Sequence, residues 1–327
     1  MKAIRIGEFG DLSSLALTEV PDTPKLTGTE VLVRVHAAGL NRADLVQAAG
    51  NYPPPAGYDP NIPGLEFAGE IVECGDAVLG FVVGDRVFGI VAGEGQAELV
   101  LTDSRCIAKI PDNLSYVHAA AVPEVFITAH DAIFTIGGLK AGETLLVHAV
   151  GSGVGLAALQ LANATNARVI GTSRTADKLD RAHDFGLENG IATNDALFAD
   201  EVARFTDGKG ANVILDLVGA SYFDENIRSF AYRGRLVLVG LTGGRSSNID
   251  LGAMLFKRAS VTGTSLRARS IDEKAIVTER FVDEVLPLLD SGVVRPSVDR
   301  AFPAAEVADA YKYLASNESF GKVILEF

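Results

Sequence analysis

Hydrophobic residues near the start of the chain fall in short runs separated by turn residues. Runs rich in Val, Ile or Leu and bounded by Gly, Pro or Asp predict strands at Met1–Gly7, Leu15–Val20, Glu30–Ala37, Leu65–Glu73, Arg86–Val91 and Gln96–Leu101. The stretch Ala48–Pro63 between the third and fourth strands contains a Tyr-Pro-Pro-Pro run, which disfavours regular structure. The first third therefore predicts a β-rich module with one long loop, and such loops are often functional.

The hydrophobic pattern changes near His118. Ala119–Thr135 is apolar at helical spacing, and continuous apolar strands then alternate with amphipathic helices, as in a parallel sheet covered on both faces. The predicted strands are Leu145–Val150, Arg168–Thr172, Gly190–Thr193, Asn212–Val218, Arg235–Leu241 and Ser260–Leu266. The predicted helices are Val154–Asn163, Ala176–Phe185, Ala196–Phe205, Tyr222–Ala231 and Glu273–Asp290.

The end of the chain returns to a mixed pattern, with a short helix at Ala304–Ala315 and a final strand at Gly321–Phe327. This order predicts that the tail rejoins the β-rich module and that the α/β domain is inserted into it. We expect residues 1–122 and 294–327 to form one domain and residues 123–293 the other. Pockets favour domain interfaces, so a cleft between the two is the expected ligand site.

The segment from Leu145 to Gly155 runs from a hydrophobic strand through a glycine-rich turn into a helix. A strict G-x-G-x-x-G is absent, but Ala149, Ser152 and Gly155 place small residues at the three critical positions. Small residues let the backbone approach a pyrophosphate, whose charge is favoured at a helix N-terminus. The alternative is a tight connection without a ligand, but the further βα units that follow favour a dinucleotide site.

The end of the next strand bears on the choice of cofactor. NAD enzymes usually carry Asp or Glu there to hold the adenosine ribose. This chain instead has Ser173 and Arg174, with Lys178 one turn later. Two cations suit a 2′-phosphate, so we expect NADPH. The alternative is that both are solvated charges on a helix surface.

Composition limits the possible partners. With 29 basic and 42 acidic residues the net charge is −13, which argues against nucleic acid and anionic membranes. No apolar run looks long enough to span a bilayer, and the start MKAIRIGEFG lacks a signal-peptide layout, so we expect a cytoplasmic protein without membrane contact. Cys74 and Cys106 lack the neighbours of a zinc site and are expected to be free thiols.

Several motifs together resemble the zinc-independent quinone oxidoreductases of the medium-chain dehydrogenase/reductase superfamily, most closely the branch that contains the p53-inducible quinone oxidoreductase. Before the glycine-rich turn they are Gly39–Leu45, Tyr52–Pro55, Gly64–Glu66, Val83–Val87 and Ala121–Glu124. After it they are Ile214–Gly219, Leu255–Arg258, Gly263–Arg267 and Gly321–Lys322. The likeness covers nearly the whole chain.

The resemblance implies an α/β protein in which a GroES-like β-rich catalytic domain encloses an inserted Rossmann domain with a doubly wound parallel sheet. Zinc-dependent relatives carry Cys where Asn41 stands and His where Leu65 stands, so we expect no metal. Without a Lewis acid to stabilise an alkoxide, reduction of an activated acceptor is the expected reaction.

The resemblance also implies site residues. Asn41 and Tyr52 are expected to face the nicotinamide and the substrate. The residues expected to bind cofactor are Thr128, Ser152, Gly153, Val154, Ser173, Arg174, Lys178, Val218, Gly240, Leu241, Ser265, Leu266, Arg267, Gly321 and Lys322. Of these, Gly321 and Lys322 are assigned with Ser173 and Lys178 to the adenosine phosphate, and Arg267 to the nicotinamide half.

Some of these polar residues have structural interpretations. Asn41 and Asp44 are good helix caps, and for Asp44 a cap is the preferred interpretation. Tyr52 has loop packing as its alternative role. Glu66 lies in an apolar strand, where a paired buried carboxylate is commoner than an acid catalyst. His148 also lies in a core strand, so we predict a hydrogen-bonded core histidine.

We therefore expect hydride transfer from NADPH to a quinone or similar electron-poor acceptor, helped by Tyr52 and Asn41. One alternative is reduction of an enone, alkenal or enoyl thioester on the same scaffold. Another is a cofactor-binding module with little turnover that binds RNA through a basic patch of Lys257, Arg258, Arg267 and Arg269. The strand Ser260–Leu266 is expected at a sheet edge, where relatives form a homodimer through the Rossmann domain.

Overall fold

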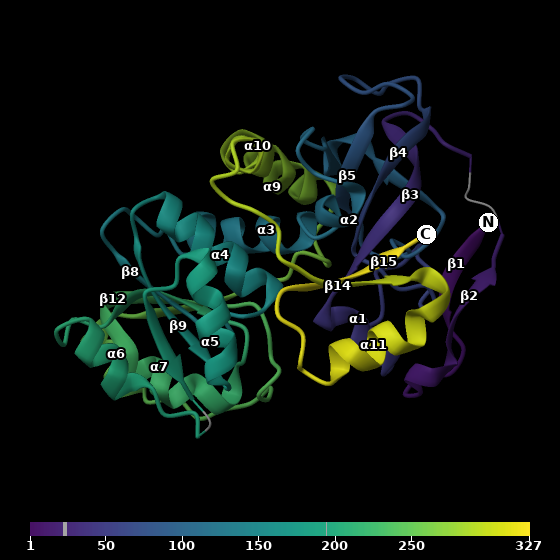
Figure 1. Ribbon diagram of the computed structural model, residues 1–327. Coiled ribbons are helices and arrows are strands. Elements are labelled where there is room, and N and C mark those ends of the chain that lie inside the picture. The colour runs from purple at the N-terminus through teal and green to yellow at the C-terminus, as the bar shows by residue number, and fades with distance from the viewer. Residues whose placement is uncertain (22–24, 194) are drawn as a thin grey trace. The chain divides into compact units, whose positions relative to one another are not determined.

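The computed structural model describes residues 1–21, 25–193 and 195–327. The chain forms two compact units, one interrupted by the other. Unit 1 comprises Met1–Ile127 and Leu266–Phe327, and unit 2 comprises Thr128–Ser265. Figure 1 shows the chain in sequence colours, with both its purple start and its yellow end in unit 1.

Unit 1 is built on a mostly antiparallel sheet in the order β14-β15-β3-β4-β5-β7, with β6 also paired to β3. Its strands are β3 (Glu30–Leu40), β4 (Glu66–Cys74), β5 (Arg86–Ile90), β6 (Leu99–Asp103), β7 (Ile107–Lys109), β14 (Val298–Pro303) and β15 (Lys322–Glu326). A separate antiparallel pair joins β1 (Lys2–Ile6) to β2 (Leu15–Glu19). The final strand β15 pairs with β3, so the tail does rejoin the β-rich module.

The helices of unit 1 alternate with these strands along the sequence. They are α1 (Arg42–Ala48), α2 (Tyr116–Ala119), α9 (Ile271–Glu284), α10 (Leu286–Asp290) and α11 (Val307–Ala315), with short 3-10 turns η1 (Leu12–Ser14), η2 (Ser104–Cys106) and η6 (Ala304–Glu306). The loop predicted at Ala48–Pro63 is irregular from Ala49 to Leu65, between α1 and β4. This unit has the mostly antiparallel, β-rich architecture expected of the GroES-like catalytic domain.

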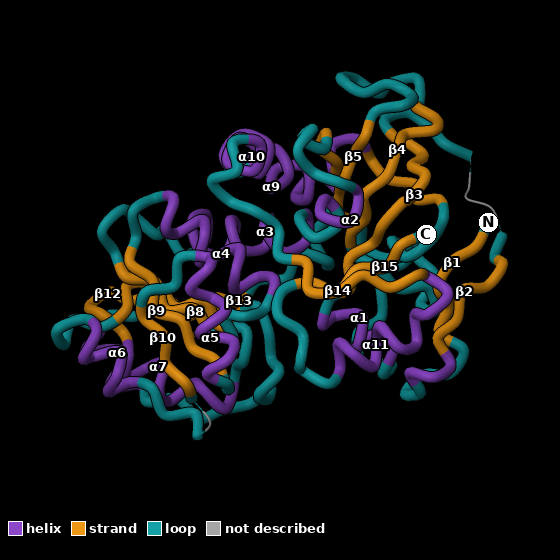
Figure 2. The backbone as a smooth tube through the Cα atoms, viewed as in Figure 1, coloured by secondary structure: helices purple, strands orange, loops and turns teal. Residues whose placement is uncertain are grey.

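Unit 2 is a parallel sheet in the order β10-β9-β8-β11-β12-β13. Its strands are drawn in orange in Figure 2. Its strands are β8 (Thr144–Val147), β9 (Arg168–Ser173), β10 (Asn189–Ala192), β11 (Ala211–Asp216), β12 (Phe230–Leu238) and β13 (Ser260–Gly263). From β8 the chain proceeds to one edge and from β11 to the other, so the strand order reverses between β8 and β11. This order makes unit 2 a Rossmann fold, in which ligands bind at the switch point.

The helices of unit 2 cover both faces of its sheet. They are α4 (Gly153–Ala164), α5 (Ala176–Ala182), α6 (Ala199–Phe205), α7 (Phe223–Ser229) and α8 (Leu251–Lys257), with short turns η4 (His183–Phe185) and η5 (Ala220–Tyr222). One core cluster joins alternate strand residues such as Leu146 and Ile214 to Phe198 and Ile227, next to or within α6 and α7. α3 (Pro123–His130) and the π-helical turn η3 (Asp131–Ile136) precede the first strand of this unit.

The second domain boundary differs from the predicted one. The segment 266–293, expected in the α/β domain, belongs to unit 1. The fully buried Phe281 of α9 meets Phe88 of β5 edge-to-face at 5.8 Å, and Asn113 donates to the carbonyl of Leu289. The single helix predicted at Glu273–Asp290 is also two helices, because Pro287 lies at the start of α10 and cannot continue α9.

One helical stretch corrects the hydropathy expectation. Among the described residues, Tyr116–Ile136 is long and apolar enough to cross a membrane, contrary to the prediction that no run is. Its apolar window is 72% buried inside the protein, as in the core helix of a globular protein.

Candidate functional site

The glycine-rich turn of unit 2 has the geometry of a dinucleotide loop. β8 ends at Val147, and α4 begins at Gly153 with Ser152 as its N-cap, whose Oγ accepts from Gly155 N at 3.1 Å. A Cβ on Gly155 would lie 2.7 Å from the carbonyl oxygens of Ala149 and Val150, so this position requires glycine. The first N–H groups of α4 have no partner within the helix and can therefore receive a phosphate.

The tip of β9 carries the residues predicted to choose the cofactor. Ser173 is buried, and its Oγ accepts from Thr175 N at 3.3 Å, so it shapes the turn itself. Arg174 is exposed and Lys178, on the first turn of α5, is half-buried. The two cations thus follow the same strand end, as a 2′-phosphate site requires.

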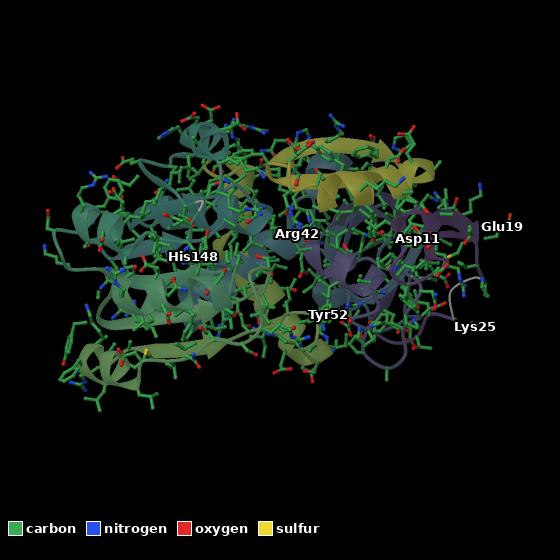
Figure 3. All side chains as sticks on the ribbon, turned by 90° about the horizontal axis from the view of Figure 1, so that it is seen from below. Asp11, Glu19, Lys25, Arg42, Tyr52 and His148 are labelled. Atoms are coloured by element: carbon green, nitrogen blue, oxygen red, sulfur yellow. The ribbon has the colours of Figure 1, made fainter. Side chains whose placement is uncertain are left out.

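His148 lies at the switch point and has the core position that the sequence predicts (Figure 3). Its Nε2 is 2.6 Å from Asn226 Oδ1 and its Nδ1 is 2.9 Å from Thr172 Oγ1. Because Asn226 donates its amide N–H to Asp216, its oxygen accepts, and the His148 proton resides on Nε2. Burial lowers the pKa of His148, which keeps the ring neutral.

Asp216 extends this hydrogen-bond chain to the loop after β11. Its Oδ1 accepts from the backbone N–H groups of Val218 at 2.7 Å and Gly219 at 2.9 Å. Sequence reasoning assigned no partners to His148 and missed the roles of Thr172, Asp216 and Asn226. The chain of polar groups joins the carboxyl ends of β9, β8 and β11, so it holds in place the edge at which a dinucleotide binds.

A small pocket of about 130 Å³ follows β11 and β12. Its lining residues are Gly219, Ala220, Phe223, Leu238, Leu241, Gly244, Arg245 and Ser247. The loop is tight, because a Cβ on Gly240 would lie 2.7 Å from the carbonyl oxygen of Leu217. Among the residues predicted for the cofactor, Leu241 lines this cavity. Val218 and Gly240 are half-buried and directly precede the lining residues Gly219 and Leu241 in the sequence.

The predicted site residues are divided between the two units. Unit 2 holds Thr128, Ser152, Gly153, Val154, Ser173, Arg174, Lys178, Val218, Gly240, Leu241 and Ser265. Unit 1 holds Asn41, Tyr52, Leu266, Arg267, Gly321 and Lys322. Thr128 is half-buried, Ser265 exposed and Leu266 buried.

Lys322 is buried in unit 1, which corrects its assignment to the adenosine phosphate. Its Nζ donates to Glu66 Oε1 at 2.5 Å, Asn41 Oδ1 at 2.7 Å and the carbonyl of Leu40 at 2.6 Å. The ammonium therefore has three acceptors inside the protein. Glu66 is a paired buried carboxylate, as predicted, and its partner is this lysine. Gly321, with φ of 87°, makes the turn into β15.

Both polar atoms of the Asn41 side-chain amide are hydrogen-bonded. Its Oδ1 accepts from Lys322, and its Nδ2 donates to Glu66 Oε1 at 2.9 Å. Asn41 is also the N-cap of α1, and its backbone N–H donates to Asp44 Oδ2 at 2.7 Å. The predicted capping role of Asp44 is confirmed. Burial raises the pKa of Asp44 to about 6.

Glu124 joins this cluster, although the sequence analysis gave it no role within its motif. Its backbone N–H donates to Glu66 Oε2 at 2.8 Å. Burial, and next the charge of Glu66, raise the pKa of the Glu124 side chain to about 8. The signal in the sequence was a carboxylate at the start of an apolar helix, directly after Pro123.

Arg267 is also buried, and its guanidinium donates to Gln47, Tyr52 and Ala92 of unit 1. Its predicted place along the nicotinamide stays a prediction, because these contacts concern only the guanidinium. The predicted basic patch changes as well, because Arg267 lies inside and Lys257 Nζ donates to the carbonyl of Phe230 at 2.7 Å.

The described residues contain no group of three or more His, Cys, Asp or Glu placed to hold a metal ion. Cys74 and Cys106 are free thiols, as predicted.

Comparison with known proteins gives full-length relatives. Residues 27–136 match the family described as Alcohol dehydrogenase GroES-like domain, and residues 153–282 match Zinc-binding dehydrogenase. Quinone oxidoreductase-like protein 2 of Bos taurus is 32% identical over 312 residues, covering 95% of this chain and 88% of the relative. Quinone oxidoreductase of Rattus norvegicus is 30% identical over 328 residues, covering 99% and 97%. A mycobacterial structure in complex with NADPH is 29% identical with a TM-score of 0.87, covering all of both chains.

Proposed function

Since this chain belongs to the quinone oxidoreductase family of the medium-chain dehydrogenase/reductase superfamily, we propose that it transfers hydride from NADPH to a quinone or a similar electron-poor acceptor without a metal. As a member it is an oxidoreductase that uses a nicotinamide dinucleotide. The cofactor preference, the acceptor and the residue roles below are proposals.

The observation that carries the proposal is the loop between β8 and α4. Gly155 leaves no space for a side chain, Ser152 caps the helix, and the first N–H groups of α4 lie at the switch point of the sheet. This loop suits a pyrophosphate. At the end of the neighbouring strand, Arg174 and Lys178 supply two cations where NAD enzymes place a carboxylate, which supports NADPH over NADH.

When bound, NADPH would supply the hydride, and reduction of a quinone to a hydroquinone takes that hydride and one proton from solvent. Tyr52 donates a hydrogen bond to the acceptor oxygen. Asn41, whose side chain is hydrogen-bonded to Lys322 and Glu66, lies against the acceptor and helps to position it. The side chains thus act mainly by positioning the acceptor.

The direct test is steady-state oxidation of NADPH with 1,2- and 1,4-quinones, and with an enone and an enoyl thioester as competing acceptors. Turnover of a quinone supports the proposal. Turnover of the enone or thioester alone assigns the enzyme to the alternative reaction, in which the α-carbon must be protonated and a side-chain acid matters more. A failure to oxidise NADPH with all of them overturns the proposal and leaves a cofactor-binding module, to be tested for RNA binding at several salt concentrations.

Assembly and location extend the proposal. β13 lies at the edge of the sheet, and Val261 on it is 37% exposed. On α8, Leu251, Leu255 and Phe256 are 70%, 72% and 81% exposed. An open edge beside apolar side chains needs cover, and a second copy of the same edge provides it in a two-fold dimer. We place the homodimer in the cytoplasm, where the free thiols stay reduced.

A further inference from the structure

The guanidinium of Arg267 binds three separate parts of unit 1. Arg267 is 4% exposed. Its Nε donates to the carbonyl of Ala92 at 2.8 Å, its Nη1 to the carbonyl of Tyr52 at 2.9 Å and its Nη2 to Gln47 Oε1 at 2.5 Å. A planar fork of donors can hold several acceptors in fixed directions, which a lysine ammonium does less well.

Tyr52 meets this guanidinium a second time through its ring. The Arg267 Cζ atom lies 4.8 Å from the centre of the Tyr52 ring. A cation at this distance from an aromatic face is attracted to it, most strongly where water is excluded. Arg267 therefore restrains both the backbone and the side-chain direction of Tyr52.

Gln47 carries the restraint to the far end of the same loop. It lies in the last turn of α1, and its Nε2 donates to the carbonyl of Pro60 at 2.9 Å. Arg267 and Gln47 together thus bind the irregular segment 49–65 near its start, at Tyr52, and near its end, at Pro60. This segment forms no strand or helix. Beyond Pro60 it is also held by contacts such as Asn61 Nδ2 to the carbonyl of Ile6 at 2.8 Å. Arg267 is the side chain that binds its first part, at Tyr52.

The support beneath Arg267 is also fixed. Lys274, 2% exposed on the first turn of α9, donates from Nζ to the carbonyl of Arg267 at 2.9 Å and to that of Arg269. The chain that enters α9 is thereby anchored. A buried cation also needs negative groups, and the carboxylate of Asp44 interacts favourably with Arg267.

We propose that Arg267 is the positioning residue for Tyr52: it sets the conformation of the loop 49–65 and presents Tyr52 to the acceptor, and it does not bind the cofactor. The inference rests on the proposed role of Tyr52 in acceptor reduction. It predicts that loss of the guanidinium fork impairs use of the acceptor while leaving the affinity for NADPH unchanged.

The test compares Arg267→Lys and Arg267→Gln, each with and without Tyr52→Phe, in the full-length protein. Lysine keeps the buried charge, so it remains informative if the glutamine variant unfolds. Arg300→Gln is the matched control, because Arg300 is exposed and stacks on Tyr313 at 4.5 Å in the same unit. The measurements are kcat and KM for a 1,4-quinone and the Kd of NADPH by calorimetry.

We expect Arg267→Lys to lower kcat/KM for the quinone about tenfold or more, with the Kd of NADPH within about twofold and Arg300→Gln unchanged. In the Tyr52→Phe background the same substitution should cost much less, because the two residues act as one unit. An equal loss in both backgrounds, or a Kd for NADPH raised as much as kcat/KM falls, overturns the proposal.

Hydrogen exchange keeps this inference separate from the proposed function. Peptides covering residues 49–65 should exchange at least about tenfold faster in Arg267→Gln or Arg267→Lys than in the wild type, and Arg300→Gln should leave them unchanged. If no quinone is reduced, faster exchange confined to this loop still supports the positioning role. Unchanged exchange overturns it whatever the substrate is.

Discussion

The ammonium nitrogen of Lys322 lies 2.5 Å from Oε1 of Glu66, and the two side chains are 3% and 0% exposed. The pair joins the last strand of the chain to β4, 256 residues earlier in sequence. It also leaves little space around it, because a Cβ on Gly39 would lie 2.6 Å from the carbonyl oxygen of Ala120 and closer still to Glu66. The ion pair thus links two distant strands of unit 1, and both of its members are hydrogen-bonded to the side chain of Asn41.

Replacing Lys322 by Met is expected to reduce the free energy of unfolding by about 3–5 kcal/mol, since it leaves the Glu66 carboxylate buried without its cation. Urea denaturation measures this loss. The matched control is Lys312→Met, which removes the solvent-exposed pair with Asp309 and should cost about 1 kcal/mol or less. Equal losses in the two variants would contradict the role given to the buried pair.

Glu124 predicts a dependence of stability on pH. Its pKa rises from 4.5 to about 8 because of burial, so the folded protein holds this proton more tightly than the unfolded chain. The resulting contribution to stability is present below about pH 4.5 and is lost as the pH rises through about 8. Glu124→Gln should therefore lose less stability than the wild type between pH 5 and about pH 9, as measured by urea denaturation. Parallel profiles would show that Glu124 keeps an ordinary pKa.

Cofactor preference is expected to depend on the two cations after β9. Arg174→Gln and Lys178→Gln should each raise the Kd of NADPH about tenfold, because a charge-assisted hydrogen bond to the 2′-phosphate is lost. NADH lacks this phosphate, so its Kd should stay within about twofold. Calorimetry measures both, with the exposed Lys209→Gln as control. If NADH binds the wild type as tightly as NADPH does, the assignment is wrong.

The hydroxyl of Tyr52 is expected to act on the acceptor. Tyr52→Phe keeps the carbonyl and the ring that Arg267 holds, so the loop should keep its conformation. We expect kcat/KM for a quinone to fall about tenfold while the Kd of NADPH is unchanged, which steady-state kinetics and calorimetry check. Tyr313→Phe, which removes a hydroxyl bonded to Asp299, is the control and should have wild-type kinetics. Unchanged kinetics in Tyr52→Phe remove this hydroxyl from the mechanism.

The proposed dimer depends on the apolar surface of α8 and β13. Phe256→Glu combined with Val261→Lys should convert a dimer into a monomer, because charges on both elements oppose burial of the edge. Analytical ultracentrifugation at micromolar concentration measures the mass. Leu79→Glu, at an exposed residue of unit 1, should remain dimeric. A wild type that sediments as a monomer contradicts the proposal.

Local patterns in the sequence predicted most of the elements and the order in which one unit interrupts the other. Alternating and continuous apolar runs indicate which residues of a strand or helix are buried. The small residues Ala149, Ser152 and Gly155 indicate a tight turn of the backbone. His148 was correctly placed in the core for the same reason. Its partner Asn226 lies 78 residues away, and no local pattern contains such a contact.

Tertiary structure decided which buried polar groups meet. Arg267 and Lys322 look in the sequence like cations for a cofactor, but a charged head can lie inside a protein when acceptors from distant segments surround it. Phe281 of α9 likewise packs on Phe88 of unit 1. The helix therefore belongs to unit 1, and the domain boundary lies before α9 and not after it. The sequence by itself determined the strand and helix order and the dinucleotide loop, because these follow from neighbouring residues. Only the folded chain assigned the cations, because their partners come from separate strands and loops.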